Sequence, residues 1–302
     1  MLFQSPLDRA LKALLACTIM TSMVASCTSL AQNAGPPAAV EAAEQEAAPM
    51  VINLKKGELL SVISVIPKQG DKAAAARSEY YQTAFPLAQQ YGLKREGQLR
   101  VIATPVGKHK SEGIIFFSWP SQAAEASLET EAEWPKIKSL RPKAWDELRV
   151  FTDELDEDLT LTFKADKTYT IAMAWTNPEN PDDYDIYMDG IKDAVAEVGG
   201  RFMYKMFDPK FESHKLKDGA PGQVTLVEWD TPEGLANFGE TQGFKDNVKY
   251  LTSGVTRFEI LALSAQSVLW IDGLPKIKTP INWPRPTAGL FLCGVCDSVL
   301  GN

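Results

Sequence analysis

The sequence predicts an α+β protein made of two tandem βαββαβ units that close on each other as an internal, pseudo-twofold barrel. Three observations favour this fold. The chain of 302 residues is long enough for two domains of ordinary size. It repeats itself at a constant offset, and each repeat shows strand and helix signals in the same order. With 45% hydrophobic and 23% charged residues, the composition is that of a globular protein rather than a disordered or fibrous one.

A duplication occupies most of the chain. The sequence aligns with itself at an offset of 110 residues, and we expect the alignment to run from the pair Glu58/Thr168 to the last strand. The aligned pairs are Trp119/Trp229, Ser121/Thr231, Trp134/Phe244, Leu140/Tyr250 and Val150/Ile260. The duplication places repeat 1 at residues 57–155 and repeat 2 at 168–265, with a linker at 156–167 between them.

The first half of each repeat reads as a strand followed by a helix. A β-branched or aromatic run predicts the strands, at 59–66 and 169–175. Apolar residues at three- and four-residue spacings predict the helices, at 80–91 and 184–198. Gly92 and Gly199 end these helices, and Pro86 is expected to kink the first or to mark its first turn.

The second half of each repeat adds a strand pair, a helix and a last strand. The strand pairs are predicted at 98–104 with 113–119, and at 201–207 with 223–229. The helices are expected to begin at 120–123 and 230–233, where Ser121, Asp230 or Thr231 can cap free N–H groups. The last strands are predicted at 147–151 and 256–263. This order is the ferredoxin-like arrangement, in which both helices cover one face of a four-stranded sheet. The bare faces of two such sheets can cover each other, which predicts the barrel.

Several segments of repeat 1 resemble the dimeric α/β-barrel superfamily. The shared features are a strand that ends in an aromatic residue, a Ser-capped helix, a short helical segment with an aromatic residue and a charged approach to the last strand. They stand here at 117–124, 133–135, 140–141 and 149–151. The resemblance spans roughly residues 57–265 and is closest in detail to small bacterial members of unassigned function. It extends more loosely to the cofactor-free and the heme-degrading monooxygenases. It implies the fold, which does not by itself determine the chemistry.

The start of the chain resembles a bacterial lipoprotein signal. Arg9 and Lys12 precede an apolar stretch that is too short to span a bilayer. Val24-Ala25-Ser26-Cys27 resembles the lipobox, whose cysteine is acylated and becomes the mature N-terminus. The sequence therefore predicts a signal peptide at 1–26 and a lipidated, flexible tether at 27–56. The lack of Asp at the second mature position favours the outer membrane, with the protein facing the periplasm.

The net charge of the chain restricts the kinds of partner that it can bind. A formal charge of −8, a pI near 5.0 and the lack of a long basic run argue against a nucleic-acid partner. The same negative charge cannot hold the protein to an anionic membrane, so we expect the lipid on Cys27 to do so. The alternative is cleavage by an ordinary signal peptidase at Ala25 or Ala31, which would leave a soluble secreted protein.

The two histidines of the chain are candidates for proton transfer. His109 and His214 each fall in the loop between the second and third strands of a repeat. A neutral imidazole can act as a general base near pH 7, and Tyr81 and Tyr187 are further candidates for this role. Two lysines flank His109, however, and a loop histidine of this kind is often only solvated.

Aromatic and charged positions are the other candidates for a site. Six aromatic residues could line an apolar ligand pocket between helices and sheet, with plain core packing as the alternative. They are Tyr80, Tyr81, Trp119, Tyr184, Tyr187 and Trp229. Six charged residues on strands are predicted to share one sheet face. Inside the barrel they must pair or line a polar pocket, whereas on an open face they would be solvated. They are Glu147, Arg149, Lys205, Glu228, Arg257 and Glu259.

The extension at 266–302 contains a proline-rich run and a CxxC motif formed by Cys293 and Cys296. In an oxidising envelope this motif predicts a small structural disulfide, with a redox pair as the alternative. No second CxxC or nearby histidine completes a zinc site, so neither a metal nor a cofactor is expected.

Two functions of different class are consistent with these features. The first is an envelope lipoprotein whose fused barrel binds a small apolar ligand or a protein partner and is not itself catalytic. The second is a cofactor-independent oxygenase or isomerase of the dimeric α/β-barrel type with a His or Tyr as proton acceptor. An enzyme needs a closed pocket in which a titratable group meets the aromatic residues, whereas a binding protein can have a filled interior.

Overall fold

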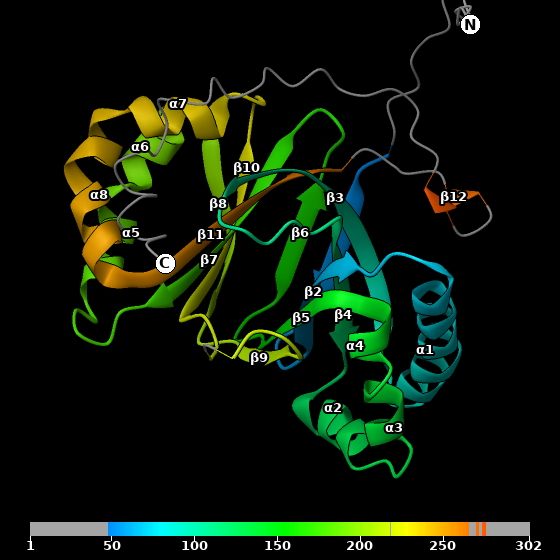
Figure 1. The fold of residues 1–302 in the computed structure, drawn as a ribbon. Helices are drawn as coiled ribbons and strands as arrows, with labels where there is room; N and C mark the ends of the chain where they lie inside the picture. Colours follow the sequence, from blue (N-terminus) through cyan, green and yellow to red (C-terminus); the bar gives the residue numbers. More distant parts are fainter. Residues whose placement is uncertain (1–47, 218, 266–269, 272–273, 276–302) are drawn as a thin grey trace, which may run out of the picture. The chain divides into compact units, whose positions relative to one another are not determined.

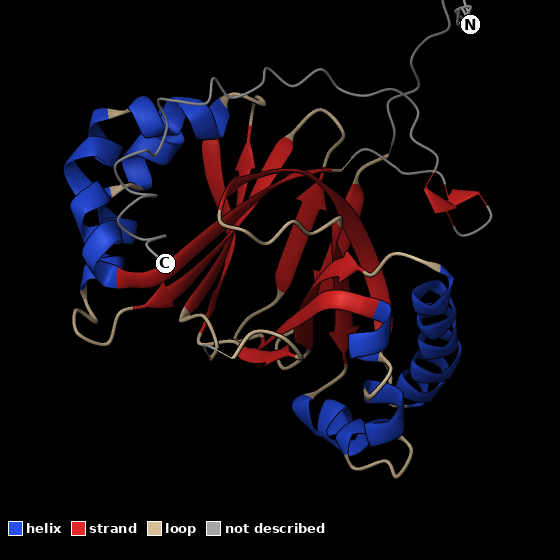
Figure 2. Cartoon of the chain, viewed as in Figure 1, coloured by secondary structure: helices blue, strands red, loops and turns tan. Residues whose placement is uncertain are grey.

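The computed structural model describes residues 48–217, 219–265, 270–271 and 274–275. This part of the chain is an α+β structure in which a nine-stranded sheet lies between two groups of helices (Figure 1, Figure 2). Among the described residues, no helix combines the length and the apolar character needed to span a bilayer. Cys27, Cys293 and Cys296 lie outside the described residues.

Repeat 1 has the predicted βαββαβ order. Its strands are β2 (Leu59–Pro67), β3 (Lys94–Val106), β4 (Gly113–Trp119) and β5 (Trp145–Glu154). Its helices are α1 (Asp71–Gln90), α2 (Gln122–Glu129), α3 (Trp134–Lys138) and α4 (Arg141–Ala144). Pro86 lies inside α1, and α1 begins before the predicted helix because its first turns are rich in alanine, which is helical without being amphipathic. The side chain of Ser121 caps α2 as predicted, accepting a hydrogen bond from the Ala124 N–H at 3.3 Å.

Repeat 2 follows the same order with one strand divided in two. Its strands are β7 (Thr168–Thr176), β8 (Gly200–Phe207), β9 (Lys210–Ser213), β10 (Gln223–Trp229) and β11 (Val255–Ser264). Its helices are α5 (Asp183–Gly190), α6 (Lys192–Glu197), α7 (Gly234–Glu240) and α8 (Gln242–Gly254). The single helix predicted at 184–198 is therefore two, separated at Ile191. The prediction that Asp230 or Thr231 caps the next helix is wrong, because α7 begins at Gly234 without a side-chain cap, and Asp230 pairs with Lys167 at 2.8 Å.

The two repeats match at an offset of 110 in their later strands, but not in their first. Trp119 and Trp229 end β4 and β10 at that offset. Trp119 pairs with Leu59 of β2, whereas Trp229 pairs with Thr168 of β7. The first strands are therefore offset by 109, and the predicted match of Glu58 with Thr168 is wrong by one residue.

The sheet closes into the predicted barrel. Its strands run in the order β8–β10–β7–β11–β3–β4–β2–β5–β9. Two of these pairings join the repeats, β11 with β3 and β5 with β9. Because β8 and β9 stand at the two ends of the order and are separated only by Asp208 and Pro209, the first and last strands meet. The fold is thus two ferredoxin-like units that form an intramolecular α/β barrel, with helices outside the sheet (Figure 2).

Three apolar clusters form the core. One lies under the helices of repeat 1 and one under those of repeat 2. The third fills the barrel and contains residues from the inward faces of both repeats, among them Leu60, Val62, Ile171 and Leu261. The inward and outward clusters alternate along each strand, as the period of two in a β-strand requires.

A two-stranded ribbon lies near the start of β2 and β7. It consists of β1 (Met50–Leu54) and β6 (Leu159–Phe163), which pair antiparallel in a sheet of their own. Phe163 contacts the Tyr169 ring of β7, with 5.1 Å between ring centroids. The strand β1 falls inside the predicted tether 27–56 and β6 inside the predicted linker 156–167, so parts of both segments are folded. A further sheet pairs β12 (Trp270–Ile271) with β13 (Leu274–Pro275).

Candidate functional site

A chain of buried polar side chains lies inside the barrel, toward the end opposite the β1–β6 ribbon. Ser64 belongs to β2, Glu147 and Arg149 to β5, and Glu259 to β11, while His109 lies on the loop 107–112 between β3 and β4. Their exposed fractions are 0% for Ser64, 2% for His109, 5% for Glu147, 1% for Arg149 and 2% for Glu259. Buried polar groups are stable only when they are hydrogen-bonded, so each must have a partner inside the protein.

Hydrogen bonds connect these side chains into one network. Ser64 Oγ lies 2.5 Å from His109 Nε2, and His109 Nδ1 lies 3.2 Å from Glu147 Oε2. Arg149 donates from Nε to Glu147 Oε1 at 2.7 Å and from Nη1 to Glu259 Oε2 at 2.5 Å. Arg257 then donates from Nε to Glu259 Oε1 at 3.0 Å. We call these six residues, Ser64, His109, Glu147, Arg149, Arg257 and Glu259, the polar network.

The environment of His109 keeps its ring neutral. Burial lowers the pKa of His109 and outweighs the hydrogen bond to Glu147, which raises it. For Glu147, burial raises the pKa, but the hydrogen bonds from His109 and Arg149 outweigh burial and lower the pKa to about 2. A neutral ring next to a carboxylate donates from Nδ1 to Glu147 and accepts at Nε2 from the Ser64 hydroxyl. The charges of the network then alternate along Glu147, Arg149, Glu259 and Arg257 and sum to zero.

The loop 107–112 turns His109 inward because its residues alternate between solvent and protein. Lys108 and Lys110 are exposed, whereas His109 and Ser111 are buried. Ser111 donates from Oγ to the Val65 carbonyl at 3.0 Å, which fastens the loop to β2. The flanking lysines make a solvated His109 the plain expectation from the sequence, and the structure overturns it.

Gly107 lets this loop approach the network. Its φ is +95°, a left-handed conformation in which glycine is favoured. A Cβ at this position would lie 2.7 Å from Cγ of Glu259. Glycine is therefore required both by the backbone angle and by the close packing of the loop against the carboxylate.

Four of the six charged strand positions meet inside the barrel, which is one of the two predicted alternatives. Arg149 and Glu259 stand at the offset of 110 in the last strand of each repeat, as do Glu147 and Arg257, so equivalent positions carry opposite charges. Lys205 and Glu228 do not join the network. Glu228 pairs with Arg201 at 3.0 Å, and Lys205 Nζ lies 4.7 Å from the centroid of the Phe202 ring.

The order Ser64, His109, Glu147 is that of a nucleophile, a base and an orienting acid. Such a nucleophile must meet a substrate carbonyl, but the side chain of Ser64 is fully buried within β2 under the loop 107–112. Both ring nitrogens of His109 are already engaged with neighbouring side chains. In this arrangement the network fastens the loop to the barrel and joins β5 of repeat 1 to β11 of repeat 2.

His214 is a half-buried residue directly after β9, close to the start of β5, and no hydrogen bond joins it to the polar network among the described residues. Burial lowers its pKa, and hydrogen bonds to the backbone of Asp146 and Trp145 oppose this shift. Its Nδ1 is buried without a hydrogen-bond partner among the described residues.

The six aromatic residues predicted to line a pocket divide between two cores. Those of repeat 1 lie under or beside its helices, where Tyr80 contacts Trp145 with 5.1 Å between ring centroids and accepts a hydrogen bond from Arg141 Nε at 3.0 Å. Tyr81 is 41% exposed. The six residues are Tyr80, Tyr81 and Trp119 in repeat 1 and Tyr184, Tyr187 and Trp229 in repeat 2. The clusters of the two repeats are separate, so these residues do not surround one common space.

The tyrosines of repeat 2 are unsuited to accept a proton near neutral pH. Burial raises the pKa of both Tyr184 and Tyr187 far above its usual range. Trp229 is equally engaged in the core and donates from Nε1 to Thr170 Oγ1 at 3.0 Å.

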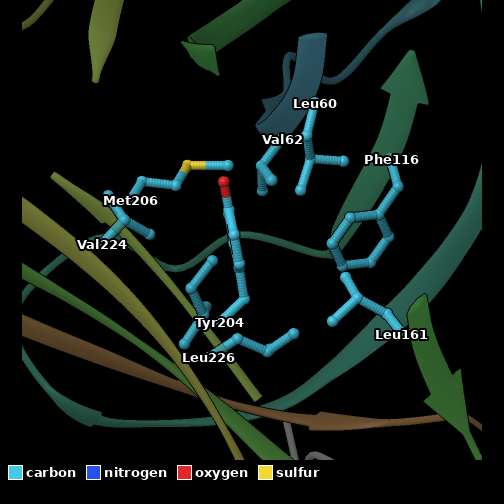
Figure 3. A pocket seen from close by; sticks show the side chains of 9 residues that line it. Leu60, Val62, Phe116, Leu161, Tyr204, Met206, Val224 and Leu226 are labelled. Atoms are coloured by element: carbon cyan, nitrogen blue, oxygen red, sulfur yellow. The ribbon is translucent and has the colours of Figure 1, made fainter. Parts of the chain in front are cut away.

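A small apolar cavity lies at the centre of the barrel (Figure 3). Its volume is about 10 Å³, close to the room that one water molecule needs. The side chains in Figure 3 converge on it from both repeats and from β6, and none of them belongs to the polar network. It is lined by Leu60, Val62, Phe116, Leu161, Ile171, Tyr204, Met206, Val224 and Leu226. The hydroxyl of Tyr204 donates to Asp153 Oδ2 at 2.6 Å.

None of these cavity residues is among the predicted pocket residues. The prediction places the pocket between helices and sheet, whereas the space lies inside the barrel, between the inward faces of the two repeats. The alternation of residues along the strands could have predicted this lining. Leu60 and Val62 on β2 are apolar residues two positions apart and point to the same face, as are Val224 and Leu226 on β10. Among the described residues, no cluster of His, Cys, Asp and Glu is arranged to hold a metal ion.

Comparison with known proteins adds similarity of fold. No protein-family model matches the chain, and no curated protein matches it. Among solved structures, an anthrone oxidase-like protein is 14% identical at a TM-score of 0.47, covering 76% of this chain and 100% of that chain. A protein from Lactobacillus acidophilus that is proposed to be a monooxygenase is 12% identical at 0.36, covering 69% and 93%. A mutant chlorite dismutase from Candidatus Nitrospira defluvii is 8% identical at 0.37, covering 70% and 93%. Similarity at these identities and scores concerns the fold alone and carries no argument about activity.

Proposed function

We propose that this protein is a non-catalytic binding protein of the bacterial cell envelope, anchored to the outer membrane through a lipid on Cys27, and that its fused barrel takes up a small apolar ligand. The observation that carries the binding proposal is the barrel interior. Its centre is apolar on all sides, holds an unfilled space, and is closed near the start of β2 and β7 by a ribbon that belongs to a sheet separate from the barrel.

The division of the interior into two zones supports this proposal. The polar network satisfies its own charges and lies apart from the cavity, whose lining side chains carry no charge. An apolar ligand is bound mainly by the area it removes from water, so an uncharged, apolar interior suits such a ligand once side chains make room for it. The envelope location rests on the sequence of the first 27 residues, in which a charged segment, an apolar segment and a lipobox-like string follow one another.

One purification tests both parts of this proposal. The mature protein, extracted from membranes, is expected to begin at an acylated Cys27 and to release an apolar small molecule into an organic extract, both detected by mass spectrometry. Val62→Phe, which adds a ring to the cavity lining, should reduce the bound amount, while Ile63→Phe on the opposite face of β2 should not. An unmodified peptide spanning Ser26-Cys27-Thr28 would contradict the anchor. A wild-type extract without any bound molecule would contradict the ligand.

The second candidate is a cofactor-independent oxygenase or isomerase with His109 as proton acceptor. The observation in its favour is the neutral, buried imidazole held between a hydroxyl and a carboxylate. Such a base needs access to a reactant, and access can be measured without knowledge of the substrate.

Diethyl pyrocarbonate, which acylates accessible neutral histidines, distinguishes the two candidates. We expect peptide mass spectrometry at pH 7 to show faster modification of the half-buried His214 than of His109, which is 2% exposed. The two are the only histidines in the chain, so each serves as the control for the other. Equal or faster modification of His109 would favour the enzyme.

A further inference from the structure

We infer that β1 is a displaceable plug of the barrel, and that the ligand is an uncharged hydrocarbon chain that takes the place of its buried side chains. This inference rests on the proposed binding function and adds to it the route of entry and the class of ligand.

The strand β1 is attached to the rest of the protein by few backbone contacts. It pairs along one edge with β6, from Met50 opposite Phe163 to Leu54 opposite Leu159, in a sheet separate from the barrel sheet. Its inward residue Ile52 is 0% exposed, whereas its neighbour Val51 is 44% exposed. Withdrawal of β1 would therefore break one short ladder and one set of apolar contacts, and would leave the ladders of the barrel intact.

The part of the β1–β2 turn before Gly57 can act as a hinge, because the Gly57 N–H donates to the Leu155 carbonyl at 2.8 Å and holds the rest of the turn to the barrel. Gly57 has φ +83° with no atom within 4 Å of a Cβ placed there, so the turn is open around it. Two contacts join this turn to Asp158, which lies just before β6: the ion pair from Lys55 Nζ at 2.7 Å and a hydrogen bond from the Lys56 N–H at 3.0 Å. The ion pair is exposed, and exposed pairs contribute little to stability. The β6 strand is held differently, because it crosses from the end of β5 to the start of β7 and is bound to the barrel at both ends.

The space that β1 occupies fits a single hydrocarbon chain. Met50 packs against Gly97 of β3, where the missing side chain makes room for its sulfur. Ile52 lies opposite Leu161, which in turn lines the central cavity. Met50, Ile52 and Leu54 together fill the volume of about 12 non-hydrogen atoms, roughly a twelve-carbon chain, and a chain placed there would extend toward the cavity.

The lining of this space disfavours a charged head group. The cavity contains no Lys or Arg, and the acceptor for the hydroxyl of Tyr204 is the carboxylate of Asp153. An anionic head would meet this carboxylate without a compensating cation in the lining, whereas a hydroxyl or a plain chain would not. We therefore expect selectivity for an alcohol over a fatty acid of equal length.

A disulfide that locks the ribbon tests the plug. Asn53 and Thr160 are paired on the outer face, where the Thr160 hydroxyl donates to Asn53 Oδ1 at 2.9 Å, and cross-strand partners at this spacing accept a disulfide. In the mature protein with Asn53→Cys and Thr160→Cys, the uncharged fluorophore N-phenyl-1-naphthylamine should bind about tenfold more weakly after oxidation than after reduction. The single variant Asn53→Cys controls for the native cysteines and should show no such difference.

Truncation of the plug gives the opposite change. Ile52→Ala should bind the fluorophore more tightly, by about tenfold, whereas Val51→Ala on the outer face should bind as the wild type does. In each case 1-dodecanol should displace the fluorophore at lower concentration than dodecanoate.

Equal binding by the oxidised and reduced double-cysteine protein would overturn the plug and leave the binding function standing. Displacement by dodecanoate as efficient as by dodecanol would overturn the uncharged class. Failure of the wild type, the reduced double-cysteine protein and Ile52→Ala to bind the fluorophore at all would overturn the binding function itself.

Discussion

Arg149→Leu is expected to lower the free energy of unfolding by about 3–5 kcal/mol, because it removes one partner of a buried ionic network and leaves the others in a water-excluded site. The side chain of Arg149 is 1% exposed and donates to both Glu147 and Glu259. Its loss deprives two buried carboxylates of a cation at the same time. Urea unfolding followed by circular dichroism measures the change, provided that the slope of the transition stays the same.

A double-mutant cycle separates this effect from lost packing. If Arg149 and Glu259 stabilise each other across the barrel, the loss in Arg149→Leu with Glu259→Leu should be smaller than the sum of the single losses by about 1–3 kcal/mol. Arg201→Leu is the control, since the Arg201 side chain is 63% exposed in its pair with Glu228, and its loss should stay below about 1 kcal/mol. Additive losses for Arg149 and Glu259 would show that the two halves are not coupled through this pair.

Acid is expected to destabilise the folded protein in two steps. The folded pKa of His109 is lowered below its ordinary value of about 6.5, so the unfolded chain binds more protons and stability falls as the pH falls through that value. For Glu147, the folded pKa of about 2 lies below the usual value. Its contribution is therefore full above about pH 4.5 and is lost as the pH falls toward 2.

Urea unfolding between pH 8 and pH 3 measures this dependence. His109→Gln should be less stable than the wild type at pH 8, and its stability should change less between pH 7 and pH 5, because only one of the two histidines with a lowered pKa, His214, then remains. The step below pH 4.5 should persist in this variant. A wild-type stability that stays level from pH 8 to pH 5 would mean that burial of His109 does not control its protonation.

The repeat and its alternating apolar residues predict the barrel because they are properties of local sequence. Alternation shows a strand, and two copies of one strand order leave two apolar faces that must meet. The single-residue shift between the first strands could not be predicted in this way. Leu59 and Thr168 are recognised as equivalent only from the strand pairing, in which they lie opposite Trp119 and Trp229. The strand β1 could not be predicted either, because its five residues follow a polar, alanine-rich segment and are too few to show an alternating pattern.

The polar network was only half predictable. The charges on β5 and β11 interrupt apolar alternation, and this interruption correctly marks them as residues on one face. Ser64 and His109 are 45 positions apart, and nothing local to either residue indicates that they meet. The two lysines beside His109 predict exposure to solvent, whereas Gly107 with its positive φ and the buried Ser111 direct the loop inward.

The opposite charges at the equivalent positions Arg149 and Glu259 bear on which halves can pair with each other. If two copies of repeat 1 faced each other as separate subunits, they would bring arginine onto arginine at the axis, and two copies of repeat 2 would bring glutamate onto glutamate. Each half carries its own counter-charge, Glu147 beside Arg149 and Arg257 beside Glu259, but the direct pair of opposite charges at the equivalent position forms only between unlike halves. Arg149 therefore meets Glu259 only when repeat 1 faces repeat 2, so this pair favours closure of the barrel within one chain over pairing of like halves.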